Sequence, residues 1–463
     1  MWEAVSDGRP NKSRFAEARL RPTISLLLTL WIFASTTHAA TLRATNSIAQ
    51  AVAAAQDSDT VLVQGPGVFH EHVIIEKRLR LIGENSPVLD GDASGTPLTI
   101  KAEGAEVRGF VVRNGGNDTG HFDSGIMIVA PQVIVADCRV EGGGFGIYIR
   151  GVNDCHLEHN VIAGNTNVVA NQRGNGIHLW KTKRNLLAHN FVTGARDGIY
   201  LSFADENLIS SNRVEQTRFG LHYMYSHRNR LLNNTFTANS VGAALMFARD
   251  CVVEGNVAFA NRRHGMLFKQ VESTRVARNV LRNQNRGLFI QQAVNDRFEE
   301  NVIEGNDIGL YLSNGSEQCV FVGNAFVRNT DQIWQPPDEV EKGRLASNRF
   351  FEKKRGNYWS DYTGSDANGD GIGDTPYHET DVFGYIMDRH PEARVLALSP
   401  AAALLRKGEE LMPLLDTQGV TDLFPIVRPP SIPLGVAALL RSADGTKVNK
   451  TSRFPEARLH PSP

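Results

Sequence analysis

Apolar and polar residues alternate in short runs along most of this chain, and each run opens at a glycine. From about Gly125 to Trp334 the pattern returns every 22 or 23 residues, as in Gly198-Ile199-Tyr200-Leu201. Strict alternation over four or five residues is typical of a strand with one buried face. A period this short holds two or three strands and their turns, which predicts one coil of a parallel β-helix per repeat. The glycines are Gly125, Gly146, Gly176, Gly198, Gly220, Gly242, Gly265, Gly287 and Gly309.

A column of asparagines follows the same period, each residue preceding an apolar one, as in Asn301-Val302-Ile303. Residues one coil apart lie above one another at about 4.7–4.9 Å, so stacked amides can hydrogen-bond along the column. Gly and Asn also tolerate the left-handed backbone that a tight corner needs. We therefore interpret both columns as structural. The asparagine column is predicted to hold Asn160, Asn190, Asn212, Asn234, Asn256, Asn279, Asn301, Asn324 and Asn348.

One coil is longer than the others. Gly146 and Gly176 lie 30 residues apart, and the surplus around 165–172 is expected to leave the coil as a surface loop. Loops on one face of a solenoid often carry function, and a neutral insertion is the alternative.

The first 40 residues are predicted to be a signal peptide. Basic residues precede an apolar run at 24–34, and Thr37-His38-Ala39 offers small residues at the cleavage position. The run is too short to span a bilayer, so we expect release into the periplasm. Residues 41–120 then read as an entry cap and the first coils, beginning with a short amphipathic helix at 47–55. A solenoid needs such a cover over its first open coil.

Composition excludes some partners. The 463 residues carry a formal net charge of -1, so no basic surface for nucleic acid or membrane is indicated.

The fold class predicted is all-β, a right-handed parallel β-helix resembling the pectin-lyase-like solenoids, with a short N-terminal helical cap and a C-terminal extension. The regular coils are expected over residues 121–356.

Four cysteines in an exported protein normally suggest disulfides, but the repeat argues against them. Cys155, Cys251 and Cys319 each precede a column asparagine by five residues, whereas Cys138 belongs to another column. The first three therefore lie roughly 19 Å and 14 Å apart, beyond the roughly 7 Å that a disulfide spans. We predict small buried corner residues without a disulfide among the column members.

Residues 357–380 carry the most specific motif, Asn357-Tyr358-Trp359-Ser360-Asp361-Tyr362 followed by a block rich in Asp and Gly. Oxygen side chains at every second position around a glycine turn match a calcium loop. The alternative is a turn held by its own backbone hydrogen bonds. The candidate Ca²⁺ ligands are Asp366, Asn368, Asp370 and Asp374.

The coils and the Trp/Asp/Gly motif together resemble the NosD family, the periplasmic β-helix proteins that support copper-centre maturation of nitrous oxide reductase. The segment 220–226 and the tail from Asp381 to Pro429 also resemble this family. The resemblance implies attachment at the inner membrane through an ABC permease with its cytoplasmic ATPase. It also implies a copper-carrying lipoprotein as donor, apo nitrous oxide reductase as recipient, and no catalytic activity. The cargo delivered to this enzyme of denitrification would be copper or sulfur.

A candidate copper site follows from the strand register. Counting from each strand glycine, positions one and three point inward, and positions two and four point outward. His222, Met224 and Met246 then face outward on adjacent coils, with His178 two coils away. Thioether and imidazole are the ligands that hold soft Cu(I). Met-rich surfaces also dock partner proteins, so an apolar docking patch is the alternative.

The C-terminal part is predicted to hold a docking extension at 381–435 and a disordered tail at 436–463. The extension combines a short helix near 400–412 with a proline-rich stretch, and its alternative role is to cover the last coil. Two rival functions remain, a polysaccharide-binding or polysaccharide-cleaving protein and an adhesive surface protein. Cleavage of a polysaccharide requires a pair of carboxylates about 5–10 Å apart on one outward face. The candidate carboxylates Asp197, Asp205 and Asp250 are instead scattered along the sequence.

Overall fold

A computed structural model describes residues 39–313, 315–336, 345–379, 399–402, 404, 408 and 420–429. The predicted signal peptide, apart from its last two residues, and the predicted tail at 436–463 lie outside this part of the chain. Within the described residues, no helix combines the length and the apolar character that crossing a membrane requires.

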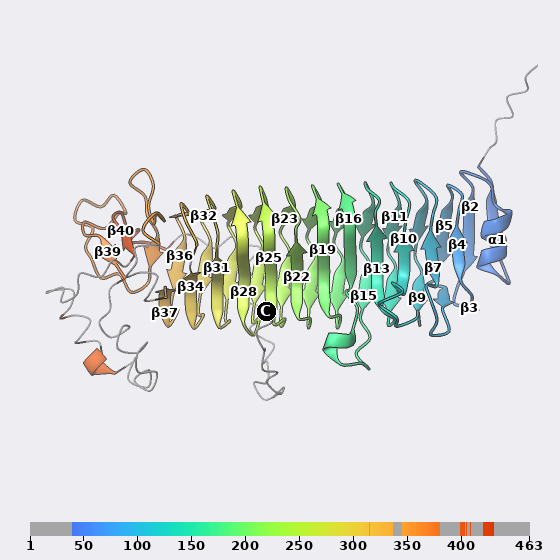
Figure 1. The fold of residues 1–463 in the computed structure, drawn as a ribbon, viewed down its shortest axis with the longest axis horizontal. Coiled ribbons are helices and arrows are strands. Elements are labelled where there is room, and N and C mark those ends of the chain that lie inside the picture. Colours follow the sequence, from blue (N-terminus) through green and yellow to red (C-terminus); the bar gives the residue numbers. More distant parts are fainter. Residues whose placement is uncertain are drawn as a thin grey trace, which may run out of the picture. The chain divides into compact units, whose positions relative to one another are not determined.

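The chain winds through three parallel sheets, and each strand pairs with the strand one coil away, as Figure 1 shows. Sheet A has thirteen strands. They are β1 (Thr41–Ala44), β2 (Thr60–Gln64), β5 (Arg80–Glu84), β8 (Glu106–Arg108), β11 (Ile134–Ala136), β14 (His156–Glu158), β17 (Leu186–Ala188), β20 (Leu208–Ser210), β23 (Arg230–Leu232), β26 (Val252–Glu254), β29 (Arg275–Ala277), β32 (Arg297–Glu299) and β35 (Val320–Val322).

Sheet B also has thirteen strands, all of three residues except the last. They are β3 (Val68–His70), β6 (Val88–Asp90), β9 (Val111–Arg113), β12 (Arg139–Glu141), β15 (Val161–Ala163), β18 (Phe191–Thr193), β21 (Arg213–Glu215), β24 (Thr235–Thr237), β27 (Val257–Phe259), β30 (Val280–Arg282), β33 (Val302–Glu304), β36 (Ala325–Val327) and β38 (Tyr358–Trp359).

Sheet C has twelve strands and includes the longest ones. They are β4 (Val73–Ile75), β7 (Leu98–Ile100), β10 (Ser124–Ile128), β13 (Phe145–Arg150), β16 (Ile177–Lys183), β19 (Asp197–Asp205), β22 (Phe219–Met224), β25 (Val241–Arg249), β28 (His264–Glu272), β31 (Arg286–Gln291), β34 (Ile308–Ser313) and β37 (Asp331–Trp334). The predicted parallel β-helix is confirmed.

The entry cap is the predicted short helix, α1 (Ile48–Ala54). Ser47 caps it, because its side chain accepts a hydrogen bond from the Gln50 amide, and Glu71 accepts one from the Ile48 amide. The helix buries Ile48 and Val52 against the first coil, next to β4. The open edge of the solenoid is thereby covered at this end (Figure 1).

The predicted inward positions are confirmed. Ile199, Leu201, Leu221 and Tyr223 are fully buried. Met266 and Phe268, which lie two coils after Leu221 and Tyr223, are fully buried as well.

The long coil also behaves as predicted. Its surplus residues leave the coil as an exposed loop that contains the short 3-10 helix η1 (Ala170–Gln172).

The glycine and asparagine columns are structural, but not for the conformational reason that we expected. Residues such as Gly198 and Asn212 are not left-handed; neighbouring residues such as Ser211 and Gln216 take those conformations. Gly198 is required by close approach, because a Cβ atom there would lie 2.2 Å from the Val214 side chain. The asparagines are required by their hydrogen bonds.

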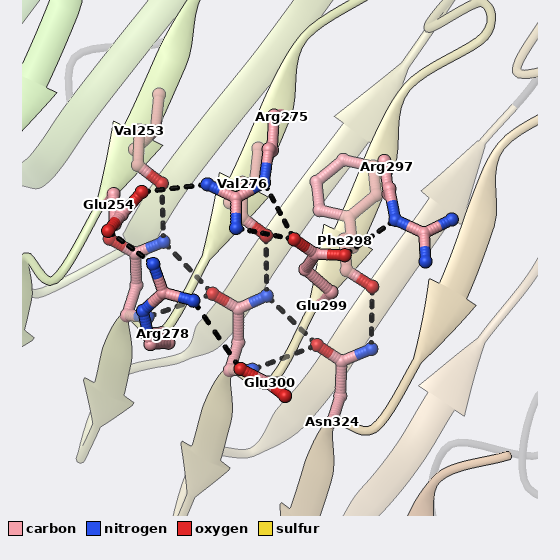
Figure 2. Close-up of polar contacts among 12 residues, drawn as sticks. Val253, Glu254, Arg275, Val276, Arg278, Arg297, Phe298, Glu299, Glu300 and Asn324 are labelled. Carbon is pink, nitrogen blue, oxygen red and sulfur yellow. Dashed lines mark hydrogen bonds and ion pairs between the residues drawn. The ribbon is translucent and has the colours of Figure 1, made fainter. Parts of the chain in front are cut away.

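Each column asparagine links two coils. Asn212 accepts hydrogen bonds from the amide and side chain of Asn190, and it donates to the Leu187 carbonyl and to Asn234. Figure 2 shows the same pattern at Asn324, which donates to the Phe298 carbonyl. On the outer side of sheet A, the figure also shows ion pairs that join neighbouring coils, such as Arg275 with Glu254 and Glu299.

One assignment in the column was wrong. Asn324 bonds to Asn357, so Asn357 forms the final rung, and Asn348 instead accepts from the Cys319 amide in a second column. That second column is Cys155, Asn185, Asn207, Asn229, Cys251, Thr274, Asp296, Cys319 and Asn348. A third column, not anticipated, links Thr217, Asn239, Asn261, Gln284, Asn306 and Asn329.

The four cysteines are buried and free, as corner residues of the columns. Burial raises the pKa of Cys138 and Cys155 to about 11, and that of Cys251 and Cys319 to about 12. These thiols are therefore protonated at neutral pH and poor nucleophiles or metal ligands.

The Trp motif forms the other end of the solenoid. Trp359 is buried, its ring stacked between Phe326 and Tyr377 at centroid distances of 4.5 and 4.3 Å. Its indole N–H donates to buried Asp422, the last residue of β40 (Thr421–Asp422), which pairs with β39 (Tyr377–His378) in a two-stranded ribbon. The described residues 420–429 therefore cover the last coil, which is the alternative role of the extension. Most of the predicted helix near 400–412 lies outside the described residues.

We expect Trp359→Ala to lower the free energy of unfolding by about 3–5 kcal/mol, because it removes the largest side chain of this stack. Urea unfolding followed by far-UV circular dichroism measures the change. Trp180→Ala is the matched control, since Trp180 is half-exposed on the outer face of sheet C and should cost far less. Equal losses in the two variants would contradict a plug role for Trp359.

We also expect Asp296→Asn to stabilise the protein in a pH-dependent way. Asp296 occupies an amide position of the second column, its Oδ2 has no partner, and burial raises its pKa to about 7. The pKa of Asp296 in the folded protein therefore exceeds the pKa of about 3.9 that an aspartate has in the unfolded chain. The aspartate consequently favours folding most below about pH 4, and this contribution to stability is lost as pH rises through 7. The amide should therefore add about 1–3 kcal/mol at pH 8 and less at pH 5.

Urea unfolding at the two pH values measures this difference. Exposed Asp250→Asn serves as the control and should show no comparable pH dependence. A gain from Asp296→Asn that is the same at pH 5 and pH 8 would contradict the role of ionisation.

Candidate metal site

The outer face of sheet C is where the candidate copper ligands meet. Strands β19, β22, β25 and β28 pair in register, so residues at the same position of successive coils form columns. One outward column runs through Tyr148, His178, Tyr200, His222, Ala244, Leu267, Phe289, Tyr311 and Trp334. The next outward column contains Trp180, Ser202, Met224, Met246 and Lys269.

Met224 and Met246 are direct neighbours. They are register partners on β22 and β25, and both side chains lie on the outer face, as predicted. They are half-buried rather than fully exposed. Met246 packs against an outer apolar cluster that includes Ala244 and Leu267, which explains the partial burial. Two thioethers are thus held side by side at the protein surface.

His222 lies on the same strand and face as Met224, two residues before it. It is only 9% exposed, whereas the register had predicted a solvent-facing imidazole. Its ring packs against Phe219 at 4.6 Å and against Tyr200 at 5.1 Å between centroids. Tyr200 of the same column and Phe219 of a neighbouring column therefore cover it. Its Nδ1 lies 3.1 Å from Asp197 Oδ2, which leaves Nε2 as the nitrogen for a metal.

Asp197 anchors this corner of the site. It is fully buried, at the start of β19, and Arg218 donates two hydrogen bonds to its carboxylate at 2.8 and 2.7 Å. Burial alone would raise the pKa of Asp197, but the hydrogen bonds from His222 and Arg218 outweigh it and lower the pKa below its usual value. The carboxylate is therefore ionised at neutral pH.

His178 is not brought together with the methionines. The ring of Tyr200 lies between His178 and His222, at 4.8 Å from the former. His178 also packs on Tyr148, and its Nδ1 contacts the Asn175 side-chain amide at 3.2 Å. Burial, with the charge of Arg196, lowers the pKa of His178 to about 3. It is a neutral side chain in the aromatic column.

The described residues of the Asp/Gly block form a turn with extensive internal hydrogen bonding. Asp366 accepts backbone N–H bonds from Gly369, Asp370 and Gly371, and Asp374 Oδ2 accepts one from Ala367. Asn368 and Asp370 likewise accept backbone bonds within the turn. These bonds fit the self-held turn, and the carboxylate oxygens keep further lone pairs for a cation, so the calcium loop and the self-held turn both stay predictions.

Another group of possible ligands lies near the entry cap. The donor atoms of His70, Asp90 and Asp92 lie within 4.8 Å of one another. Asp90 is bound by Arg113 and Asn114, and His70 pairs with Asp92 at 2.7 Å. Each member thus has a protein partner.

Sequence reasoning treated Asp197 as one of several scattered aspartates and did not single out Arg218. The register gave no signal, because strict alternation places the residue before each strand glycine on the inner face together with positions one and three. In the structure Asp197 lies one coil before Phe219 and contacts His222 on the outer face instead.

Comparisons with known proteins agree on one family. A family profile described as "Periplasmic copper-binding protein (NosD)" matches residues 158–364. A protein of Stutzerimonas stutzeri named "Probable ABC transporter binding protein NosD" is 34% identical over 382 residues, which cover 79% of this chain and 86% of the relative. A protein of the same name from Pseudomonas aeruginosa is 35% identical over 381 residues, covering 79% and 87%.

Solved structures with some likeness include two polysaccharide lyases. The family PL6 alginate lyase AlyGC is 16% identical with a TM-score of 0.47, covering 72% of this chain and 55% of its own. A mannuronic acid specific family 6 lyase from human gut microbiota is 13% identical with a TM-score of 0.47, covering 81% and 100%. At such values the likeness carries no inference about substrate. The identity to the two relatives over most of their length does carry one about ancestry: this chain belongs to the NosD family.

Proposed function

We propose that this protein is the periplasmic component of an ABC-transporter-linked system that supports copper-centre assembly of nitrous oxide reductase. In this role it binds or relays Cu(I) as cargo and is not itself an enzyme. The observation that carries the proposal is the pairing of Met224 and Met246 on adjacent coils. Thioethers select soft Cu(I) over the harder divalent ions. The names of the family profile and of the relatives support the same conclusion.

The proposed ligands are Met224 and Met246 through their sulfur atoms and His222 through Nε2. Two thioethers and one neutral imidazole form an uncharged ligand set that suits a monovalent soft ion. His178 stands apart behind Tyr200 and has no place in this set. Hydrophobic neighbours such as Phe219 and Leu267 limit access of water to the site.

The proposed partners follow from the family and not from the contacts. They are an inner-membrane ABC permease with its cytoplasmic ATPase, a copper-carrying lipoprotein donor, and apo nitrous oxide reductase. Attachment to the inner membrane is proposed to be peripheral, through the transporter. The relatives' printed name, ABC transporter binding protein, supports a transporter partner.

Docking of a partner protein on the same surface is favoured by a further observation. Three aromatic residues, Phe203, Tyr225 and Phe247, directly follow Ser202, Met224 and Met246 in the sequence. Their rings stack with centroid distances of 5.4 and 4.6 Å. Phe203 is 53% and Tyr225 is 42% exposed, an unusual exposure for aromatic side chains in such a row. Binding of Cu(I) and docking of a protein that carries it are compatible functions of this patch.

Polysaccharide cleavage is the rival function. It needs a free pair of carboxylates or an equivalent acid and base. Asp197 is the buried carboxylate on the outer face of sheet C, and its oxygens are engaged by Arg218 and His222. This engagement favours a supporting role over acid–base chemistry.

We expect the double variant Met224→Ala/Met246→Ala to bind Cu(I) at least about tenfold more weakly than the wild type, because both sulfur ligands are lost. Anaerobic titration against a chromogenic Cu(I) chelator measures the affinity. Met127→Ala is the matched control, since Met127 lies on the outer face of sheet C, away from the pair. Unchanged affinity in the double variant would remove these residues from the site.

A further inference from the structure

A buried carboxylate on an outward-facing column needs an explanation. Asp197 faces away from the solenoid interior, yet its side chain is 0% exposed. Removing an ion from water is costly unless partners compensate it. Here Arg218 supplies two hydrogen bonds to the two carboxylate oxygens, and the imidazole of His222 supplies the third contact at 3.1 Å.

These contacts determine which nitrogen of His222 carries the proton. A carboxylate that already accepts from Arg218 can only accept from the imidazole, so Nδ1 carries the hydrogen. A neutral imidazole then has its lone pair on Nε2. We infer that Asp197 is a positioning residue for the Cu(I) site, holding His222 in the tautomer whose Nε2 binds the metal. This inference rests on the proposed Cu(I) function and adds to it a residue that orients one of the ligands.

Arg218 and Phe219 complete the support. The Arg218 guanidinium lies 4.8 Å from the centre of the Phe219 ring, and that ring packs on His222. Arg218 therefore fixes the carboxylate by hydrogen bonds and the imidazole plane through Phe219. Metal-binding histidines commonly donate their second nitrogen to a carboxylate, and loss of such a partner typically costs 10–100-fold in metal affinity.

The test is Asp197→Asn, which keeps the side-chain volume. Arg218 has only donors, so it should bind the amide oxygen and turn the amide N–H₂ toward His222. Nδ1 must then accept, and the proton moves to Nε2. We expect the ring ¹⁵N shifts of His222, assigned by their loss in His222→Gln, to report the opposite tautomer. We also expect anaerobic Cu(I) affinity to fall about 10–100-fold.

Asp154→Asn is the matched control, because Asp154 also holds an arginine, Arg184, by two hydrogen bonds of 2.8 Å, whereas Asp197 in addition contacts the imidazole of His222. Its Cu(I) affinity should equal that of the wild type. Should Asp197→Asn fail to fold, the wild-type spectrum alone decides. A wild-type His222 with its proton on Nε2 would overturn the inference.

The outcomes separate this inference from the proposed function. If Cu(I) affinity falls in the methionine double variant but not in Asp197→Asn, the positioning role is wrong and the thioether site stands. If it falls only in Asp197→Asn, the positioning role stands and the methionines are not ligands. If neither variant changes the affinity, both are wrong.

Discussion

The structure depends on side-chain amides that hydrogen-bond from one coil to the next. The column asparagines are buried, apart from half-buried Asn348, so every buried amide oxygen and nitrogen that lost its partner would cost about 1–3 kcal/mol. A slip of one residue in one coil would break several such bonds and turn the apolar positions outward. The columns therefore fix the register of sheet C, and the register alone places Met224 beside Met246.

The architecture and the direction of the side chains could be predicted from sequence, because a two-residue alternation and a constant period are local properties. The last rung could not. Asn324 and Asn357 are 33 residues apart, so counting by one ordinary period selects Asn348, which belongs to the neighbouring column. The burial of His222 could not be predicted either, because it depends on how two rings pack against the imidazole, Tyr200 of the same column and Phe219 of another.

The Trp motif and the surface proposed to bind Cu(I) lie in separate parts of the solenoid. Trp359 and Asp422 close the end of the solenoid, where they satisfy the last rung and cover its apolar interior. The methionine pair and its support lie on the central coils of sheet C. The first region therefore closes the fold, whereas the proposed Cu(I) chemistry rests on Met224, Met246 and the Asp197–His222 contact.

The coil-by-coil construction has a geometric consequence. Each coil contacts chiefly its immediate neighbours, so inserting or deleting one between β28 and β38 leaves the strands around Met246 unaltered. Such a change would shift the terminal plug along the stack by about 4.7–4.9 Å. The number of coils therefore sets the distance between the terminal plug and the strands around Met246 without any change to the contacts within either region.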